Sequence, residues 1–105
     1  MAKSKIMIDN SRTRVTEWKF EPGEETGQHI HEYDYVVVPM EDGVLKIINE
    51  DGSTTFSELK KGISYFKQKG VNHNVINNNR FPYSFIEIEL KWHYILKINS
   101  GYYNY

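Results

Sequence analysis

The sequence predicts an all-β protein of the sandwich or small-barrel type, and three observations support this prediction. Apolar residues recur mostly at every second position and are rich in Val, Ile, Tyr and Phe, which favour a pleated, half-buried surface. Turn-forming residues separate these runs. The runs follow one another at a spacing of roughly 8 to 12 residues, which is typical of β-sandwiches and barrels. The length of 105 residues suits one domain, which we place over residues 1–105.

Turn chemistry sets the bounds of each expected strand in chain order. Pro22-Gly23 follows the first run, and Glu41-Asp42-Gly43 ends the Val-rich third run. Asp51-Gly52 stands between two alternating runs and is the clearest hairpin signal. Glycines 62 and 70 flank the next run, and the asparagines 77–79 end the one after it. We therefore expect strands at residues 12–20, 26–31, 33–40, 44–49, 53–59, 63–68, 73–78 and 83–92.

Composition narrows the possible functions. Lys plus Arg number 13 and Asp plus Glu 14, so the formal charge of -1 provides no overall field for nucleic acid or an anionic membrane. No segment approaches the roughly 20 apolar residues of a membrane span. The chain has no cysteine, which excludes disulfides, thiolate metal ligands and a cysteine nucleophile. We expect a soluble, cytoplasmic protein with a small-molecule partner, and neither nucleic acid nor membrane as partner.

Two histidines one residue apart provide the first site hypothesis. Side chains alternate along a strand, so His29 and His31 point to one face while Ile30 points to the other. Neutral imidazole is a common ligand of divalent metals, and a rigid strand can aim two imidazoles at one ion. Such pairs also occur by chance on surfaces, so the pair alone is a weak signal.

The surroundings of this pair resemble the cupin family. Residues 23–43, GEETGQHIHEYDYVVVPMEDG, are similar to the first cupin motif, with both glycines and both histidines in place. Residues 62–77, GISYFKQKGVNHNVIN, are similar to the second motif, with His73 and Asn77 in place and Gln68 where the motif has proline. The first stretch also resembles a subgroup of small single-domain cupins, the β-alanine degradation (BauB) proteins. The resemblance implies a cupin-type double-stranded β-helix, or jelly-roll barrel, around one divalent metal (Fe, Zn, Ni, Mn or Cu) held by His29, His31 and His73.

One position departs from the family pattern. The glutamate expected three or four residues after the second histidine would be Tyr35 or Val36, and counting back from Gly43 favours Val36. The carboxylate ligand is therefore missing. Three neutral imidazoles leave the full charge of the metal and at least one open position, which favours chemistry over a closed structural site. A cupin that has lost its metal, with the histidines as core residues, is the alternative.

Other residues are candidates on weaker grounds. Tyr35 is a candidate catalytic residue if its hydroxyl faces the barrel, although a core tyrosine is the simpler interpretation. Glu87 is a candidate ligand or general base if the face that carries Glu87 and Glu89 lines the barrel, but a solvent face explains the same alternation. Candidate residues of the substrate pocket are Val36, Tyr65, Gln68 and Trp92.

By analogy with cupins that have three histidines and no acidic ligand, the resemblance implies a metal-dependent enzyme of the dioxygenase type that acts on a small, carboxylate-bearing molecule. A redox-neutral isomerase or lyase acting on a sugar acid or keto acid is the first alternative. A non-catalytic ligand- or metal-binding module is the second, because no acid/base pair is obvious. The aromatic segment 93–105, which contains His93, is expected to be an arm, a docking segment or a homodimer contact.

Overall fold

The computed structural model describes residues 1–91, and its secondary structure is made of strands, with no helix in that range. The all-β prediction is therefore confirmed. No helix within the described range is long and apolar enough to span a membrane. The expected arm at 93–105 and the pocket candidate Trp92 lie outside the described residues. The strands are β1 (Lys3–Asp9), β2 (Thr13–Phe20), β3 (His29–Ile30), β4 (Asp34–Pro39), β5 (Gly43–Asn49), β6 (Thr54–Leu59), β7 (Tyr65–Lys67), β8 (Asn72–Asn77) and β9 (Tyr83–Leu90).

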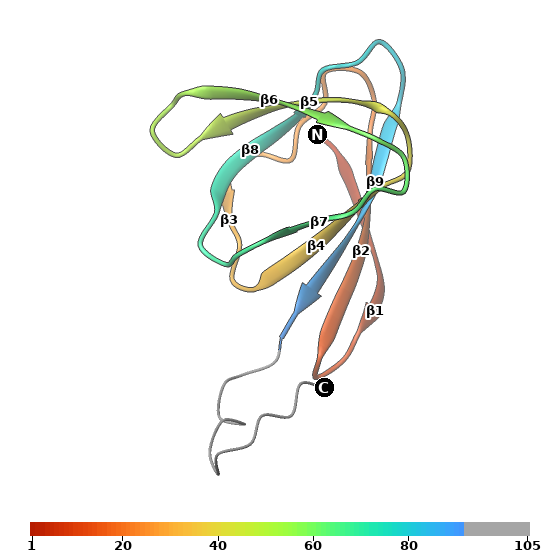
Figure 1. The fold of residues 1–105 in the computed structure, drawn as a ribbon, viewed down its shortest axis with the longest axis vertical. Coiled ribbons are helices and arrows are strands. Elements are labelled where there is room, and N and C mark those ends of the chain that lie inside the picture. The colour runs from red at the N-terminus through yellow and green to blue at the C-terminus, as the bar shows by residue number, and fades with distance from the viewer. Residues whose placement is uncertain (92–105) are drawn as a thin grey trace.

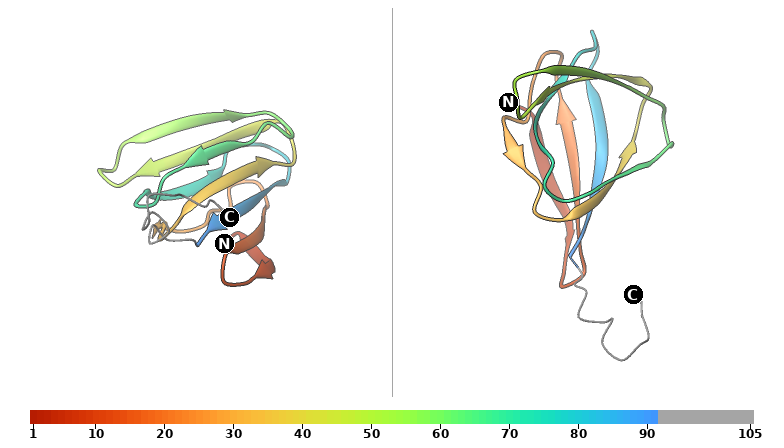
Figure 2. Two further views of the ribbon diagram at one scale, coloured as in Figure 1. Left: turned by 60° about the horizontal axis from the view of Figure 1, so that its bottom comes forward. Right: turned by 60° about the vertical axis from the view of Figure 1, so that its left-hand side comes forward.

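Two antiparallel sheets enclose the core in a jelly-roll arrangement. In the described part of the chain one sheet has the order β1-β2-β9-β4-β7 and the other the order β3-β8-β5-β6. The two sheets curve around a common interior, which the right-hand view of Figure 2 shows end on (Figures 1 and 2). Non-consecutive neighbours such as β2 and β9 require long crossings between the sheets, as a jelly roll does.

Register across the five-stranded sheet determines which side chains face the interior. Glu87 of β9 lies opposite Thr16 of β2 and Val37 of β4, and Val37 lies opposite Tyr65 of β7. The neighbouring inward row is Arg14, Glu89, Tyr35 and Lys67. Since side chains alternate along each strand, Ile86, Ile88, Val36 and Val38 point to the outer face.

This register corrects the expected faces of the last strand. The carboxylate face of β9 lines the interior together with Tyr83 and Phe85, which are buried. The apolar residues Ile86 and Ile88 are on the outer face instead. Alternation alone could not distinguish the two faces, because the inward face carries both core aromatics and carboxylates.

The N-terminal strand β1 was not predicted. All seven of its side chains are exposed, so no buried face imposes a pattern on the sequence. A β-bulge between Ile6 and Ile8 also breaks the alternation. The expected strand 26–31 shortens to the two residues of β3, because residues 25–27 contact the partner strand β8 only through an isolated bridge and single hydrogen bonds.

Gly43, a glycine of the first motif, has a packing role. A Cβ atom at this position would lie 2.6 Å from Cε1 of Tyr83, a distance that real Cβ atoms do not adopt. The Tyr83 ring is fixed there because it is buried and its hydroxyl donates a hydrogen bond to the Glu41 carbonyl at 2.8 Å. Glycine at position 43 therefore allows the start of β5 to pack closely against the Tyr83 ring.

Candidate metal centre

Three imidazoles converge where β3 pairs with β8. His29 of β3 lies directly opposite His73 of β8, and His31 follows β3 in the chain. The Nε2 atom of His31 lies 3.0 Å from Nε2 of His29 and 3.1 Å from Nε2 of His73. The structure thus brings the three predicted ligands together, two from paired strands and one from the adjoining loop.

Backbone and side-chain contacts fix each ring. The His31 main chain is held on both sides, because its N–H donates to Val71 and its carbonyl accepts from Gly70. Gly70 has a φ of 96°, a left-handed conformation that favours glycine and explains the glycine of the second motif. Nδ1 of His29 lies 2.8 Å from the Gly27 carbonyl, and a proton assigned to Nδ1 leaves the Nε2 lone pair directed at the other two histidines.

The donor set fits a divalent cation. A ring nitrogen carries either one proton or one lone pair, so Nε2 of His31 cannot form good hydrogen bonds to both neighbours at once. Burial, followed by the charge of His29, lowers the pKa of His31 to about 4. Burial and its two histidine neighbours lower the pKa of His73 to about 3, with a further contribution from Lys67. At neutral pH both rings are therefore in the neutral form that binds metal.

Tyr35 occupies the inward position where the family glutamate was expected. Its ring is 2 % exposed and stacks on His31, with ring centroids 3.9 Å apart and an interplanar angle of 16°. Burial, then Glu87 and Tyr65, raise the pKa of Tyr35, so the phenol stays protonated. Counting back from Gly43 to Val36 was therefore misleading, because Val36 points to the outer face.

A cavity of about 350 Å³ is lined by two of the three histidines, His29 and His73. It lies between the two sheets, and its volume is in the range of small-molecule sites. Val36 and Gln68 are not among its lining residues, because Val36 faces outward and Gln68 comes after the end of β7. The ionisable side chains that line it are those of His29, Tyr35, Tyr65, Lys67, His73 and Glu87.

Two carboxylates on β9 differ in their surroundings. Glu89 is buried and accepts two hydrogen bonds from the Arg14 guanidinium, at 2.6 and 2.9 Å. That bidentate pair raises the pKa of Arg14. Burial, followed by repulsion from Glu89, raises the pKa of Glu87 to about 7. One carboxylate is therefore charge-paired, while the other is able to exchange a proton near neutral pH.

Trp18 approaches Glu87 from β2. Its indole N–H lowers the pKa of Glu87, yet the two groups do not reach hydrogen-bond geometry. Nε1 of Trp18 is therefore buried without a hydrogen-bond partner among the described residues. An unpaired buried N–H on a cavity wall is a position where a ligand acceptor would be favourable.

Sequence reasoning missed Lys67 and Trp18 as cavity residues. Lys67 alternates with Tyr65 on β7, so the selection of Tyr65 as a pocket residue could also have identified Lys67. Trp18 lacked any motif, and only the pairing of β2 with β9 places it beside Glu87. The wall opposite carries the neutral polar side chains of Asn49, Thr55 and Ser57.

Comparisons with known proteins agree with this fold. Residues 16–89 match the family model described as Cupin domain. The chain is 45% identical over 86 residues to the β-alanine degradation protein BauB of Pseudomonas aeruginosa, covering 82% of this chain and 90% of that protein. A crystal structure of a cupin domain from Bordetella pertussis Tohama I has 48% identity and a TM-score of 0.84, over 87% of this chain and 94% of the other. The polyketide cyclase RemF from Streptomyces resistomycificus shares the fold, with a TM-score of 0.67 and 21% identity over 87% of this chain and 68% of its own.

Proposed function

Because the chain belongs to the cupin family, we propose that it is a metal-dependent enzyme in which His29, His31 and His73 hold one divalent ion. The observation that carries this proposal is the convergence of three Nε2 atoms, with neighbouring pairs at 3.0 and 3.1 Å. No carboxylate joins the three histidines in the cluster that could hold an ion within residues 1–91. The histidine-only site leaves the charge of the ion uncompensated, which favours binding of an anion.

The substrate in this proposal is a small molecule that carries a carboxylate. Lys67 lines the same cavity as His73 and its charge lowers the pKa of His73, so an ammonium group lies near the proposed metal site. Within residues 1–91 Lys67 has no ion-pair partner. The name of the Pseudomonas relative refers to degradation of β-alanine, which is a small carboxylate-bearing molecule. That name supports a substrate of this kind.

The first reaction class that we propose is a dioxygenase. When bound, a redox-active metal such as iron would supply activation of dioxygen and of the substrate. The protein's own contribution is to orient the substrate between Lys67 and the histidines, and to exclude water with the apolar walls formed by Val37, Leu45 and Val75. Tyr35 supports His31 and stays protonated, so it can donate a hydrogen bond into the cavity.

A redox-neutral isomerase or lyase is the second candidate, and Glu87 is the observation that favours it. A carboxyl group with a pKa of about 7 in a metal-adjacent cavity suits the transfer of a proton to and from carbon. The substrate would again be a sugar acid or keto acid. The third candidate is a module that binds a ligand or metal and catalyses no reaction.

Metal content and oxygen uptake separate these candidates. Protein purified without a histidine tag is expected to contain close to one divalent ion per chain. The variant with both His29→Ala and His73→Ala should lose it, whereas His93→Ala, the change of the fourth histidine, should not. Iron together with oxygen consumption on thiol or keto acids supports the dioxygenase. Zinc without oxygen consumption moves the proposal to the isomerase or lyase.

Unchanged metal content in the double variant would show that the three histidines are not the site. A metal that binds without turnover of any acid in the panel would favour the binding module. Cytoplasmic location and a homodimeric state, both expected from the sequence, belong to the same proposal.

A further inference from the structure

One wall of the cavity carries polar groups that the protein leaves without hydrogen bonds. Tyr35, Tyr65 and Glu87 line the cavity, and none of these three side chains forms a hydrogen bond with residues 1–91. All three polar groups reach the cavity, because Nε1 of Trp18 is the only unpaired side-chain nitrogen or oxygen in that range that is closed off from solvent. The three groups, which we call the polar cluster, are therefore accessible to a ligand.

The register of the five-stranded sheet places two members of the polar cluster on either side of a small residue. Tyr65 of β7 and Glu87 of β9 both lie opposite Val37 of β4. Their Cα atoms are therefore about 10 Å apart, at about 4.8 Å per strand, and the short valine leaves room between the two side chains. Burial, followed by the charge of Glu87, raises the pKa of Tyr65 to about 12, so the two polar groups are close enough to interact.

Tyr35 adds the third polar group from the next inward row of the sheet. It lies two residues before Val37 on β4, so both side chains point to the interior. Its ring stacks on His31, and burial, then Glu87 and Tyr65, raise the pKa of its hydroxyl. The polar cluster therefore begins beside the three histidines and extends away from them along the cavity wall.

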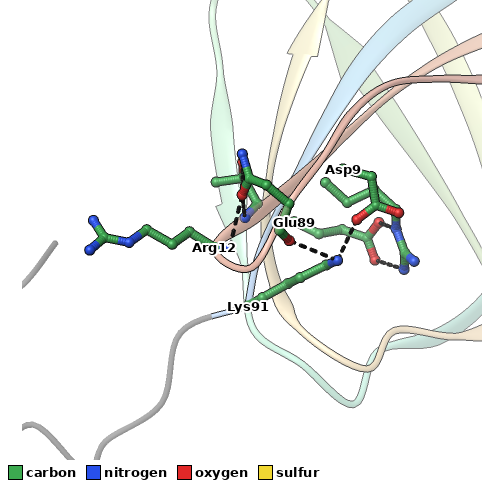
Figure 3. Close-up of polar contacts among 7 residues, drawn as sticks. Asp9, Arg12, Glu89 and Lys91 are labelled. Carbon is green, nitrogen blue, oxygen red and sulfur yellow. Dashed lines mark hydrogen bonds and ion pairs between the residues drawn. The ribbon is translucent and has the colours of Figure 1, made fainter.

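The other inward carboxylate of β9 is already occupied by protein groups. Glu89 accepts two hydrogen bonds from the Arg14 guanidinium, at 2.6 and 2.9 Å. Figure 3 shows Glu89 within a group of polar contacts that also contains the ion pair of Asp9 with Lys91. Glu87 lies two residues away on the same face and forms no ion pair in the described part of the chain. A ligand can therefore reach a free carboxyl group at Glu87 but not at Glu89.

The polar cluster offers hydrogen-bond donors in apolar surroundings. Phenol hydroxyls are protonated at neutral pH, and burial, followed by Glu89, raises the pKa of Glu87 to about 7, so that its carboxyl group also carries a proton in many molecules. Val75 and Leu45 of the other sheet line the same cavity, and such apolar walls strengthen a hydrogen bond. A carbonyl oxygen has two lone pairs and no proton, so it can accept from two of these donors without leaving a donor of its own unpaired.

We propose that the polar cluster binds a carbonyl oxygen, and that the ligand of the cavity is a small oxo acid. Its carboxylate lies at the end that holds Lys67 and the three histidines, and this half of the proposal rests on the proposed function. Its keto or aldehyde oxygen accepts hydrogen bonds from the polar cluster. The inward rows of Tyr35 and Glu87 are two residues apart, or about 7 Å at about 3.3 Å per residue. Two methylene groups between the carboxylate and the carbonyl, as in 4-oxopentanoate, suit this spacing.

Two acids of equal chain length test the binding of the carbonyl group. Calorimetric titration of zinc-loaded protein should show that 4-oxopentanoate binds about 5–20-fold more tightly than pentanoate, which is the gain expected from one or two hydrogen bonds between neutral groups. Tyr65→Phe removes only a hydroxyl and should reduce this ratio below about threefold, with the affinity for pentanoate unchanged. Tyr33→Phe is the matched control, because Tyr33 does not line the cavity, and it should keep the full ratio.

The carbonyl carbon gives a second readout that needs no variant. With 13C at its keto carbon, 4-oxopentanoate bound to the unmodified protein should resonate downfield of its position in water, because donors in surroundings of low dielectric constant polarise the carbonyl bond. An upfield shift is expected of a carbonyl group that lies against apolar side chains, and it would overturn the proposal.

The outcomes separate this proposal from the proposed function. Equal affinity of the unmodified protein for the two acids, or an equal fall of the ratio in Tyr65→Phe and Tyr33→Phe, would overturn the carbonyl site and leave the carboxylate end in place. Binding of neither acid to the zinc-loaded protein would overturn both, because the cavity would then hold no carboxylate. Circular dichroism checks that each variant is folded.

Discussion

The imidazole of His31 and the phenol of Tyr35 lie face to face, with centroids 3.9 Å apart and planes 16° from parallel. The stack joins a proposed ligand in the loop after β3 to the buried centre of the five-stranded sheet. At the position where the family motif has a ligand glutamate, this chain has the ring of Tyr35, which holds the orientation of the proposed ligand His31. The substitution therefore exchanges a charge at the proposed metal site for rigidity of a neighbouring histidine.

Removal of the Tyr35 ring should weaken both the fold and the metal site. Tyr35→Ala is expected to lower the free energy of unfolding by about 3–5 kcal/mol, as for other large aromatic core residues. Loss of the support for His31 should also reduce metal affinity by about 10–100-fold. Tyr35→Phe keeps the stack and serves as the control, with an expected loss of affinity below about threefold. Urea unfolding and metal titration measure these quantities, and equal metal affinity in the two variants would contradict the role of the stack.

Metal removal should lower thermal stability through the three histidines. An ion that binds only the folded state adds about 2.7 kcal/mol at a free concentration one hundred times Kd. Calorimetry with and without a chelator should therefore show a higher midpoint for the metal-loaded protein. The shift should disappear in His73→Ala and persist in His93→Ala. A metal-dependent shift of equal size in His73→Ala would place the ion elsewhere.

The strands predicted from the sequence match the structure where one face of the strand is buried, and they do not match where no face is buried. Strands β4 and β5 could be predicted because their inward residues, such as Val37 and Leu45, alternate with half-buried ones. The three histidines could be predicted because two stretches of the chain, residues 23–43 and 62–77, resemble the two cupin motifs in which they stand. The edge strand β1 could not, since its side chains are all exposed.

The inward position of Glu87 also could not be predicted from alternation. An inner face that mixes Phe85, Glu87 and Glu89 looks like a solvent face in the sequence. Only the bidentate contact of Arg14 with Glu89, formed across 75 residues of chain, explains how a carboxylate pair is accommodated inside. Long-range pairing of this kind leaves no local signal.

The Glu87 carboxyl should make the metal-free protein less stable as the pH rises. Its pKa is raised from 4.5 to about 7 in the folded protein, by burial and by Glu89, against the opposing effects of Trp18 and Arg14. Tyr35 and Tyr65 face it as neutral phenols. Between pH 4.5 and about 7 the folded state keeps a proton that the unfolded chain has lost, so this group's contribution to stability falls across that window.

Glu87→Gln removes this titration and is the variant that tests it. The unmodified protein should lose up to about 3 kcal/mol from this group between pH 5 and pH 8, and the variant should not. Urea unfolding of both proteins without metal at the two pH values measures the difference. The same pH dependence in both proteins would mean that Glu87 does not carry the effect.

Lys67 should determine affinity for anions at the cavity. Malonate, a small dicarboxylate, can be titrated into zinc-loaded protein by calorimetry. Lys67→Gln is expected to weaken its binding about tenfold, because a charge-assisted contact contributes about 1.5–3 kcal/mol and part of it is lost to solvent at an exposed side chain. Lys67→Arg should retain most of the affinity.

Lys69→Gln provides the matched control for Lys67. Lys69 is an exposed lysine two residues further along, and its backbone N–H donates to Asp34, but it does not line the cavity. Its substitution should leave malonate affinity within about twofold, and metal content should be equal in all variants. The effect of Lys67→Gln should also shrink as salt is added, because screening weakens attraction at an exposed ammonium. Equal losses in the two glutamine variants would show that net charge, rather than the position of Lys67 beside His73, attracts the anion.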